Sequence, residues 1–202
     1  VREKLVQALM EKHDVKVVLA RPDRRVKFTL PDEWPRRGSE SAPIRVVEFG
    51  SYLCPFCRVL QEGLSSLRKD ADVQVAFVDL TPRPQGSQWT TEHLVECAAK
   101  QGKRWEVHDA LYKGGKGIGT SDQELESFAS GVGIYGERLR RCLKETGSQP
   151  AQGPRLATSL GVASTPVVLV NERVLLGVQS REQLQNAIRE ERVRLGLTKE
   201  PM

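Results

Sequence analysis

Two kinds of apolar pattern alternate along this chain: short continuous runs and longer stretches with a helical period. Residues 44–50, 73–80 and 167–170 are short and predominantly apolar, as in strands of a sheet that is covered on both faces. Residues 54–69 and 181–195 carry apolar positions three or four apart, which predicts amphipathic helices packed on such a sheet. Strands and helices in this order indicate an α/β fold.

A long segment between the second and third strand runs has helical character only. We expect helices there at residues 91–101, 105–112, 122–132, 136–145 and 154–160. Ser121, followed by Glu124, offers a helix start with capping residues. After the third strand run we expect a last strand at residues 174–177, and Ser180 caps the final helix.

The first 43 residues predict a lead-in to this core. Residues 2–12 have the pattern of a short amphipathic helix. Residues 15–20 and 26–30 look like strands separated by a charged turn. Residues 31–43 contain several prolines among charged and small residues, which indicates a connecting loop.

Two cysteines with two residues between them, Cys54 and Cys57, follow the strand run at 44–50 and open a helix. The first turn of a helix carries unpaired N–H groups and partial positive charge, so a thiolate there is stabilised. We expect Cys54 to be the exposed nucleophile and Cys57, one turn further in, to resolve the mixed disulfide. Pro55 suits the first turn, where its missing N–H costs nothing. The motif therefore predicts disulfide exchange.

A structural zinc site is the alternative for this pair. Such a site needs two further Cys or His ligands at suitable spacing. The other cysteines, Cys97 and Cys142, are far apart in the sequence, and neither belongs to a second pair of this kind. The pattern favours a redox pair, and we expect no metal or other cofactor.

A second signal is the Thr165-Pro166 pair directly before the strand run at 167–170. Its peptide bond is a candidate for the cis form, although trans is the default for such a pair alone. Together with the cysteine pair, the sequence resembles the thioredoxin superfamily and specifically its DsbA-like branch. The matching stretches keep the family's order over about residues 41–192: 42–49, Cys54-Pro55-Phe56-Cys57, 96–103 with Trp105 and His108-Asp109, 160–162, Thr165-Pro166 and Asn171.

The resemblance implies a thioredoxin fold with an inserted helical domain. We expect residues 41–84 and 155–196 to form the thioredoxin-fold domain and residues 85–154 to form the insertion. Residues 1–40 would be an N-terminal lead-in of helix and strand.

The resemblance also implies how substrate binds. Thr165-Pro166 is expected to be cis and to lie beside Cys54, and the substrate-binding residues would be Pro55, Phe56, Thr165 and Pro166. The backbone there would pair with an extended substrate strand, which gives affinity with little sequence selectivity. A broad range of unfolded or cysteine-containing proteins would then be substrates.

Glu48, six residues before Cys54, matches the position of a buried acid in thioredoxin-like proteins. The resemblance implies that it moves protons to and from Cys57 through water. Burial would raise its pKa and make it a general base. The alternative is a surface glutamate on a short strand, and the alternation of that strand does not decide between the two.

Cys97 and Cys142 fall on two expected helices of the inserted domain. Some DsbA-like relatives have cysteines at similar positions, where they form a second, structural disulfide. The resemblance favours such a disulfide here, closing a loop of roughly 45 residues. Two buried free thiols, acting as small hydrophobic residues, are the alternative.

The net charge of +5 comes from scattered Lys and Arg, and only 5% of residues are aromatic, so we expect no nucleic-acid partner. No run approaches the roughly 18 apolar residues of a membrane span. The chain starts at Val1 without a leader pattern, so we read it as a mature or trimmed fragment; a membrane anchor or upstream domain could precede it. Four cysteines fit an oxidising compartment, and the resemblance implies the bacterial periplasm or cell envelope.

We expect a thiol-disulfide oxidoreductase that acts on unfolded or folding proteins and needs a redox partner to reoxidise or reduce it. The residues between the cysteines tune thiolate stability. Strongly oxidising DsbA has histidine where this chain has Phe56, so we expect an intermediate potential and oxidase activity. A reductase or isomerase of the same fold is one alternative, and a non-catalytic peptide-binding or chaperone module is another. The chain shows no dimerisation module, which favours a monomeric oxidase over an isomerase.

Overall fold

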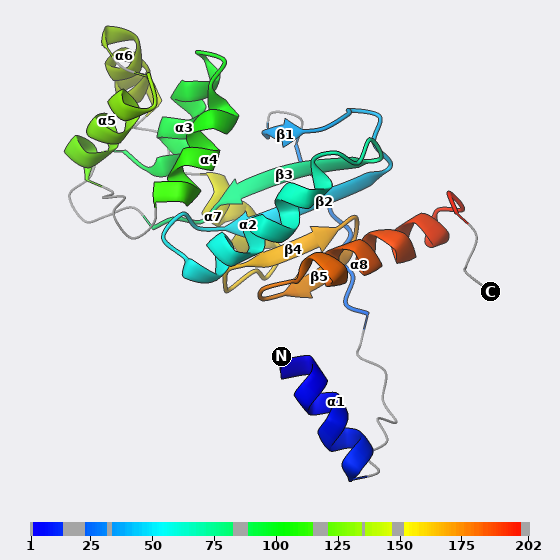
Figure 1. The fold of residues 1–202 in the computed structure, drawn as a ribbon. Coiled ribbons are helices and arrows are strands. Elements are labelled where there is room, and N and C mark those ends of the chain that lie inside the picture. Colours follow the sequence, from blue (N-terminus) through cyan, green and yellow to red (C-terminus); the bar gives the residue numbers. More distant parts are fainter. Residues whose placement is uncertain are drawn as a thin grey trace.

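The computed structural model describes residues 2–13, 23–31, 34–82, 89–114, 121–134, 136–146 and 152–198. Figure 1 shows a twisted sheet with helices on both of its faces and a group of helices at one end. Short strands and amphipathic helices alternate along the chain, so the α/β architecture expected from the apolar pattern is confirmed.

The sheet is mixed and has five strands. They are β1 (Arg36–Arg37), β2 (Ile44–Gly50), β3 (Val73–Asp79), β4 (Val167–Val170) and β5 (Arg173–Leu176). Their order is β1-β3-β2-β4-β5, with β2 parallel to β3 and antiparallel to β4. Strand β2 is therefore central, and its carboxyl end lies beside the start of β4, where Phe49 pairs with Val167.

Helices cover both faces of this sheet. Helices α2 (Pro55–Leu67) and α8 (Arg181–Arg194) pack on one face. Helix α7 (Gln152–Ser159) packs on the other face together with residues 26–31. Ser180 caps α8 through a hydrogen bond from the backbone N–H of Gln183, which confirms the predicted start of this helix.

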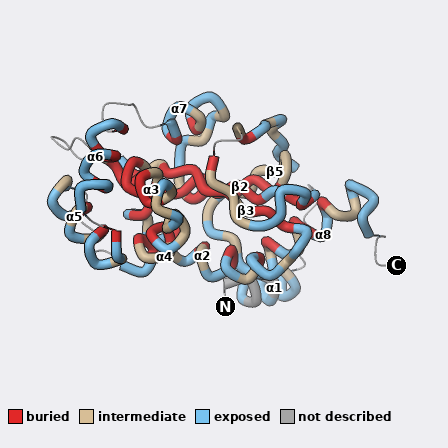
Figure 2. Tube along the Cα trace, turned by 90° about the horizontal axis from the view of Figure 1, so that it is seen from above, coloured by how far each residue is buried: buried red, intermediate tan, exposed pale blue. Residues whose placement is uncertain are grey.

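Side chains of the central strands alternate between the two cores. On β2, Val46 contacts the core beneath α2 and α8, whereas Phe49 contacts the core beneath α7. Figure 2 shows this burial along β2 and β3, with exposed residues mainly on the outer helices. Burial on both faces explains why these strands have almost continuous apolar sequences.

Four further helices form a separate group at one end of the sheet (Figure 1). They are α3 (Thr91–Ala99), α4 (Arg104–Gly114), α5 (Asp122–Gly131) and α6 (Glu137–Thr146). Helix α5 begins with the predicted capping box of Ser121 and Glu124. These helices lie in the sequence between β3 and β4, and their apolar side chains form a core that also includes Tyr52, Cys57 and Phe77. The domain limits expected at residues 84–85 and 154–155 stay a prediction.

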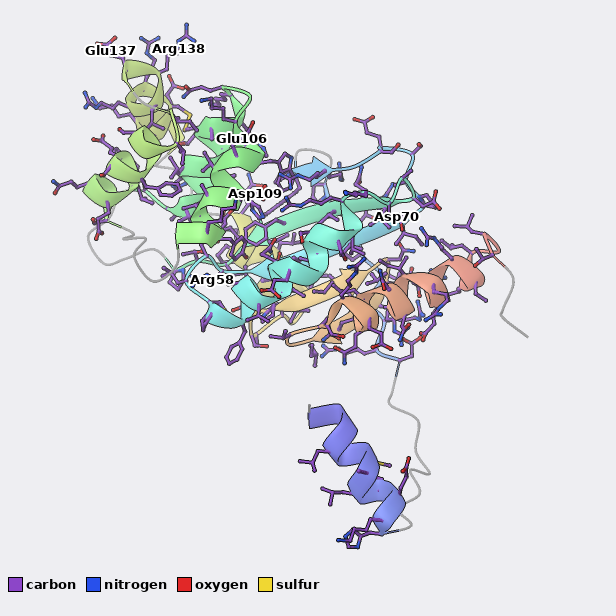
Figure 3. All side chains as sticks on the ribbon, viewed as in Figure 1. Arg58, Asp70, Glu106, Asp109, Glu137 and Arg138 are labelled. Carbon is purple, nitrogen blue, oxygen red and sulfur yellow. A yellow bond between two sulfur atoms is a disulfide. The ribbon has the colours of Figure 1, made fainter. Side chains whose placement is uncertain are left out.

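A charged contact joins the helical group to α2. Arg68, which follows α2, donates two hydrogen bonds to Asp109 on α4, at 3.0 and 2.8 Å. Arg37 also donates to Asp109, and its guanidinium carbon lies 4.4 Å from the centre of the Trp105 ring. Figure 3 shows Asp109 on the side of α4 that faces α2. The contact holds α4 beside the helix that carries the cysteine pair.

The lead-in differs from its prediction in two places, at residues 26–30 and at β1. Helix α1 (Arg2–Lys12) is present as expected and stands apart from the sheet in Figure 1, and the strand expected at residues 15–20 lies outside the described residues. The strand predicted at residues 26–30 is wrong. Only one bridge forms there, between Arg25 and Arg173, because the apolar side chains of this segment pack on the sheet face beneath α7 instead of extending the edge.

Strand β1 was not foreseen within the loop expected at residues 31–43. It has only two residues, both arginines, and pairs antiparallel with β3. Its sequence has no apolar alternation, so only the position of the neighbouring strand specifies it.

Candidate active site

Cys54 and Cys57 occupy the start of α2, four to seven residues after the end of β2. Cys54 is the N-cap residue, with extended backbone angles (φ −81°, ψ 117°), and Pro55 occupies the first helical turn. The Cys54 Sγ accepts a hydrogen bond from the backbone N–H of Cys57 at 3.4 Å. Cys54 is partly exposed and Cys57 is fully buried, and both are free thiols in this structure.

Hydrogen bonding favours the thiolate form of Cys54. Burial is the largest single influence and disfavours the charge, but hydrogen bonds outweigh it and lower the pKa of Cys54. These bonds involve the Thr165 side chain and the backbone N–H groups of Cys57 and Phe56. A thiolate at a helix N-terminus is the reactive form of a cysteine.

The second cysteine has the opposite tendency. Burial raises the pKa of Cys57 to about 12, and the negative charges of Glu48 and Cys54 add to that effect, while a backbone hydrogen bond from Ser51 opposes it. Cys57 therefore holds its proton whenever it is not bonded to another sulfur. The two thiols differ because one lies at the surface and the other lies behind it.

The segment before β4 completes the surface around Cys54. The Thr165–Pro166 peptide bond is cis, and the Cys54 Sγ lies 3.7 Å from the Thr165 carbonyl oxygen. The two segments meet because the end of β2 and the start of β4 are neighbours in the sheet. Pro166 is buried and Pro55 is exposed.

Exposed apolar side chains surround this point. Phe56 is 62% exposed, and Leu53 and Val59 are exposed on either side of it in the sequence. Because exposed large apolar groups that gather in one place mark contact surfaces, the neighbourhood of Cys54 is suited to bind polypeptide.

Glu48 lies behind the cysteines, on β2, and is 1% exposed. The alternative of a surface glutamate is therefore wrong, because Glu48 lies in the part of this central strand that is covered on both faces. Glu48 Oε2 accepts a hydrogen bond from Gln61 Nε2 at 2.6 Å, and Oε1 accepts one from the Tyr112 hydroxyl at 3.2 Å. Burial raises the pKa of Glu48 to about 8, although both hydrogen bonds act to lower it.

Aromatic rings from several elements enclose this acid. The rings of Tyr52, Phe77, His108 and Tyr112 pack against one another with centroids 4.7 to 5.8 Å apart. The Tyr52 hydroxyl and His108 Nδ1 are 2.9 Å apart, and burial lowers the pKa of His108 to about 3, so its ring is neutral. Burial among neutral side chains, away from bulk solvent, is what raises the pKa of a carboxyl group.

Sequence reasoning did not identify Gln61 and Tyr112 as part of this site. Gln61 carried a signal, since it lies one turn beyond Cys57 on α2 and on the same helix face. Tyr112 carried none, because it is 64 residues from Glu48 and is brought there only by the packing of α4.

The remaining cysteines lie in the helical group. Cys97 on α3 and Cys142 on α6 form a disulfide bond instead of two free thiols, and both are buried. No three His, Cys, Asp or Glu side chains among the described residues gather as a metal ion would require. Within the same residues, no helix has the length and apolar character needed to cross a bilayer.

Comparison with protein families gives a match over most of the chain. A family model described as Thioredoxin matches residues 32–190. Among curated proteins, the chain is 27% identical over 174 residues to Disulfide bond formation protein D of Bacillus subtilis, covering 78% of this chain and 76% of that protein. It is also 30% identical over 164 residues to Na(+)/H(+) antiporter NhaA 3 of Salinispora tropica, of which it spans only 24%.

Solved structures of similar proteins have the same fold. BdbD from Bacillus subtilis, in its oxidised form, superposes with a TM-score of 0.69 at 26% identity, covering 83% of this chain and 98% of that one. A thioredoxin-like oxidoreductase from Silicibacter pomeroyi gives a TM-score of 0.68 at 28% identity, covering 80% and 94%. The predicted thioredoxin fold with an inserted helical domain is confirmed.

Proposed function

This chain belongs to the thioredoxin family, as a DsbA-like thiol-disulfide oxidoreductase, and we propose that it acts as an oxidase that donates a disulfide from Cys54 and Cys57 to other proteins. One observation carries the proposal: the partly exposed Cys54 has a lowered pKa, while Cys57 directly behind it has a raised one. A thiolate that is stable in the reduced protein makes the disulfide form a better oxidant.

The reaction starts from the oxidised pair. A substrate thiolate attacks the Sγ of Cys54, the bond between Cys54 and Cys57 breaks, and its electron pair goes to the Cys57 sulfur. A second substrate thiolate then attacks the substrate sulfur of the mixed disulfide. Cys54 leaves as a thiolate, and the substrate keeps the new disulfide.

Glu48 supplies the proton in this sequence. Cys57 has a pKa of about 12, so its sulfur takes up a proton as soon as its bond to Cys54 breaks. Glu48, with a pKa of about 8, holds a proton at pH 7, and its charge influences Cys57 directly. The proton passes from Glu48 to Cys57 through water, and returns to Glu48 when the pair is reoxidised.

The surface around Cys54 favours unfolded or cysteine-containing polypeptides as substrates. Pro55, Phe56, Thr165 and Pro166 bind the substrate, with the backbone beside Pro166 available to pair with an extended strand. Because each turnover leaves the pair reduced, a redox partner must accept two electrons from it. The Cys97–Cys142 disulfide fits an oxidising compartment, and we place the protein in the bacterial periplasm or cell envelope.

Three alternatives remain distinct from this proposal. A reductase or an isomerase of the same fold would use the same pair in another direction, and a peptide-binding or chaperone module would not use the thiols at all. The test is the rate at which a reduced, unfolded protein regains its native disulfides with the oxidised chain present. Acceleration that is lost in Cys54→Ser supports the oxidase, and equal assistance from both proteins would indicate a chaperone.

A further inference from the structure

We propose that Tyr112 is a positioning residue of the dithiol site, supplied by the helical group: its hydroxyl holds the Glu48 carboxyl group where it exchanges a proton with Cys57. The inference rests on the proposed function, because it concerns the proton donor of the same reaction. It gives the helical group a part in the chemistry beyond covering the site.

The Glu48 carboxyl group is held from two sides. The Tyr112 hydroxyl on α4 donates to Oε1 at 3.2 Å, and Gln61 on α2 donates to Oε2 at 2.6 Å. Each oxygen has its own donor, and the two donors belong to different elements. The plane of the carboxyl group is therefore fixed only while α2 and α4 keep their places beside β2.

Tyr112 is itself fixed by the helix that carries the cysteines. Its side chain is 4% exposed, and its ring packs on Tyr52 with centroids 4.9 Å apart. Its backbone carbonyl accepts a hydrogen bond at 3.0 Å from Nε of Arg58, the residue directly after Cys57. Figure 3 shows Arg58 on α2, at the end of this helix that lies near α4. One chain of contacts thus runs from the cysteine helix through Tyr112 to Glu48.

Gly50 leaves the space in which this hydrogen bond forms. A Cβ atom at Gly50 would lie 2.6 Å from Glu48 Oε1 and 2.8 Å from the Tyr112 hydroxyl oxygen. Both distances are too short for a carbon atom, so any larger residue would displace one of the two partners. The glycine at the end of β2 is matched to the contact between Glu48 and Tyr112.

Several other groups near Glu48 carry or can carry charge. From the elements packed around it these are Tyr52, Cys54 and Cys57, Asp79, His108, and the arginines Arg37 and Arg68. The pKa of Asp79 is raised to about 6 by burial, that of His108 is lowered to about 3, and that of Tyr52 is raised well above its ordinary value. In the oxidised protein the cysteines do not titrate. The contribution of the Cys54 charge to the raised pKa of Glu48 is then absent, but burial, its largest cause, remains, so the pKa of Glu48 stays well above its ordinary value.

The Tyr112 hydroxyl should therefore leave a signature in a pH profile. Burial raises the pKa of Tyr112 well above its ordinary value, so the hydroxyl keeps its proton and donates it in a hydrogen bond. Donation to a carboxylate favours the charged form and lowers the pKa of Glu48. Removal of the hydroxyl should move the titration of Glu48 upward by about one pH unit, since hydrogen bonds to charged groups are among the stronger ones.

The experiment follows reduction of the oxidised protein by dithiothreitol, with the rate divided by the concentration of dithiothreitol thiolate. The wild-type rate should fall as pH rises through the raised pKa of Glu48, because Glu48 loses the proton that Cys57 needs. In Tyr112→Phe we expect the fall about one pH unit higher. In the matched control Tyr52→Phe, which removes a buried hydroxyl bonded to His108 instead, the fall should stay at the wild-type pH.

The controls separate this inference from the function on which it rests. Glu48→Gln should abolish the fall, and adding Tyr112→Phe to it should change nothing further. If Glu48→Gln abolishes the fall but Tyr112→Phe leaves it at the wild-type pH, the role of Tyr112 is overturned and that of Glu48 stands. If the fall persists in Glu48→Gln, both are overturned, whereas loss of disulfide exchange in Cys54→Ser still tests the oxidoreductase itself. Thermal unfolding verifies that each variant folds before its profile is compared.

Discussion

The Sγ atom of Cys54 lies 3.4 Å from the backbone nitrogen of Cys57, yet the two thiols have opposite environments. Cys54 receives hydrogen bonds at the start of α2 and is partly exposed, whereas Cys57 is fully buried beneath it. The helix start therefore stabilises a thiolate at one cysteine and a thiol at the other. This difference assigns attack by substrate to Cys54 and release to Cys57.

Substitution of the buried cysteine should trap substrate. In Cys57→Ser, Cys54 can still form a mixed disulfide, but no second thiol remains to resolve it. The Cys54 thiolate attacks a disulfide of an oxidised substrate, and the other substrate sulfur leaves as a thiolate. We therefore expect covalent adducts of Cys57→Ser with disulfide-containing proteins, detected as higher masses that disappear on reduction. Cys54→Ser is the matched control and should form few adducts, because Cys57 is buried and keeps its proton. Equal adduct formation by both variants would contradict the assigned roles.

A histidine between the cysteines should make the pair more oxidising. Phe56 lies in the first turn of α2 and is 62% exposed, so Phe56→His adds a polar, partly cationic side chain near the Cys54 thiolate without filling a core site. Stabilising the thiolate stabilises the reduced protein and raises the reduction potential. The potential is measured by equilibration with glutathione. Val59→His, at an exposed position further along the same helix, should shift it less, and an unchanged or lower value in Phe56→His would count against thiolate stabilisation.

The second disulfide should stabilise the fold without taking part in exchange. It connects α3 to α6 across a separation of 45 residues. Removing it in the double variant Cys97→Ala, Cys142→Ala should lower the free energy of unfolding by about 2–4 kcal/mol, as measured by urea denaturation. The potential of the Cys54–Cys57 pair should not change. A large change in that potential would mean that the helical disulfide communicates with the active site.

The buried acid should cost stability at high pH. Because burial raises the folded-state pKa of Glu48 from 4.5 to about 8, the folded state holds this proton more tightly than the unfolded state. The contribution of Glu48 to the free energy of unfolding is fully present below pH 4.5 and is lost as pH rises to about 8. Relative to the wild type, Glu48→Gln should therefore gain up to about 1.4 kcal/mol per pH unit across this window.

Urea denaturation at pH 5, 7 and 9 would measure this gain. Glu106→Gln on α4, at an exposed position, is the control, and its curve should run parallel to the wild type. A parallel curve for Glu48→Gln as well would mean that the Glu48 carboxyl group titrates normally in the folded protein.

Most helices and strands could be predicted from the sequence because each is specified by residues within it or directly before it. The strands around β2 have continuous apolar runs, and α5 and α8 begin with capping residues that need no distant partner. The prediction at residues 26–30 was wrong for the opposite reason. Its apolar residues can be buried either by packing on the face of a sheet or by joining the sheet as a strand. Only the tertiary arrangement distinguishes the two.

The site was predictable to the same extent. The spacing of Cys54 and Cys57 at a strand-to-helix junction was enough to identify them as a redox pair. The surroundings of Glu48 do not, because Tyr112 reaches it from α4 and Gly50 matters only through the space it leaves. Contacts between residues so far apart in sequence depend on how the helical group packs on the sheet, which no local pattern encodes.

The most direct test of the account is a redox titration of Cys54 and Cys57 against glutathione, read by alkylation of free thiols and intact mass. We expect a reduction potential well above the roughly −270 mV of thioredoxin, since the thiolate of Cys54 is stabilised in the reduced protein. A value near that of thioredoxin would contradict the oxidase assignment and identify a reductase that needs an electron donor.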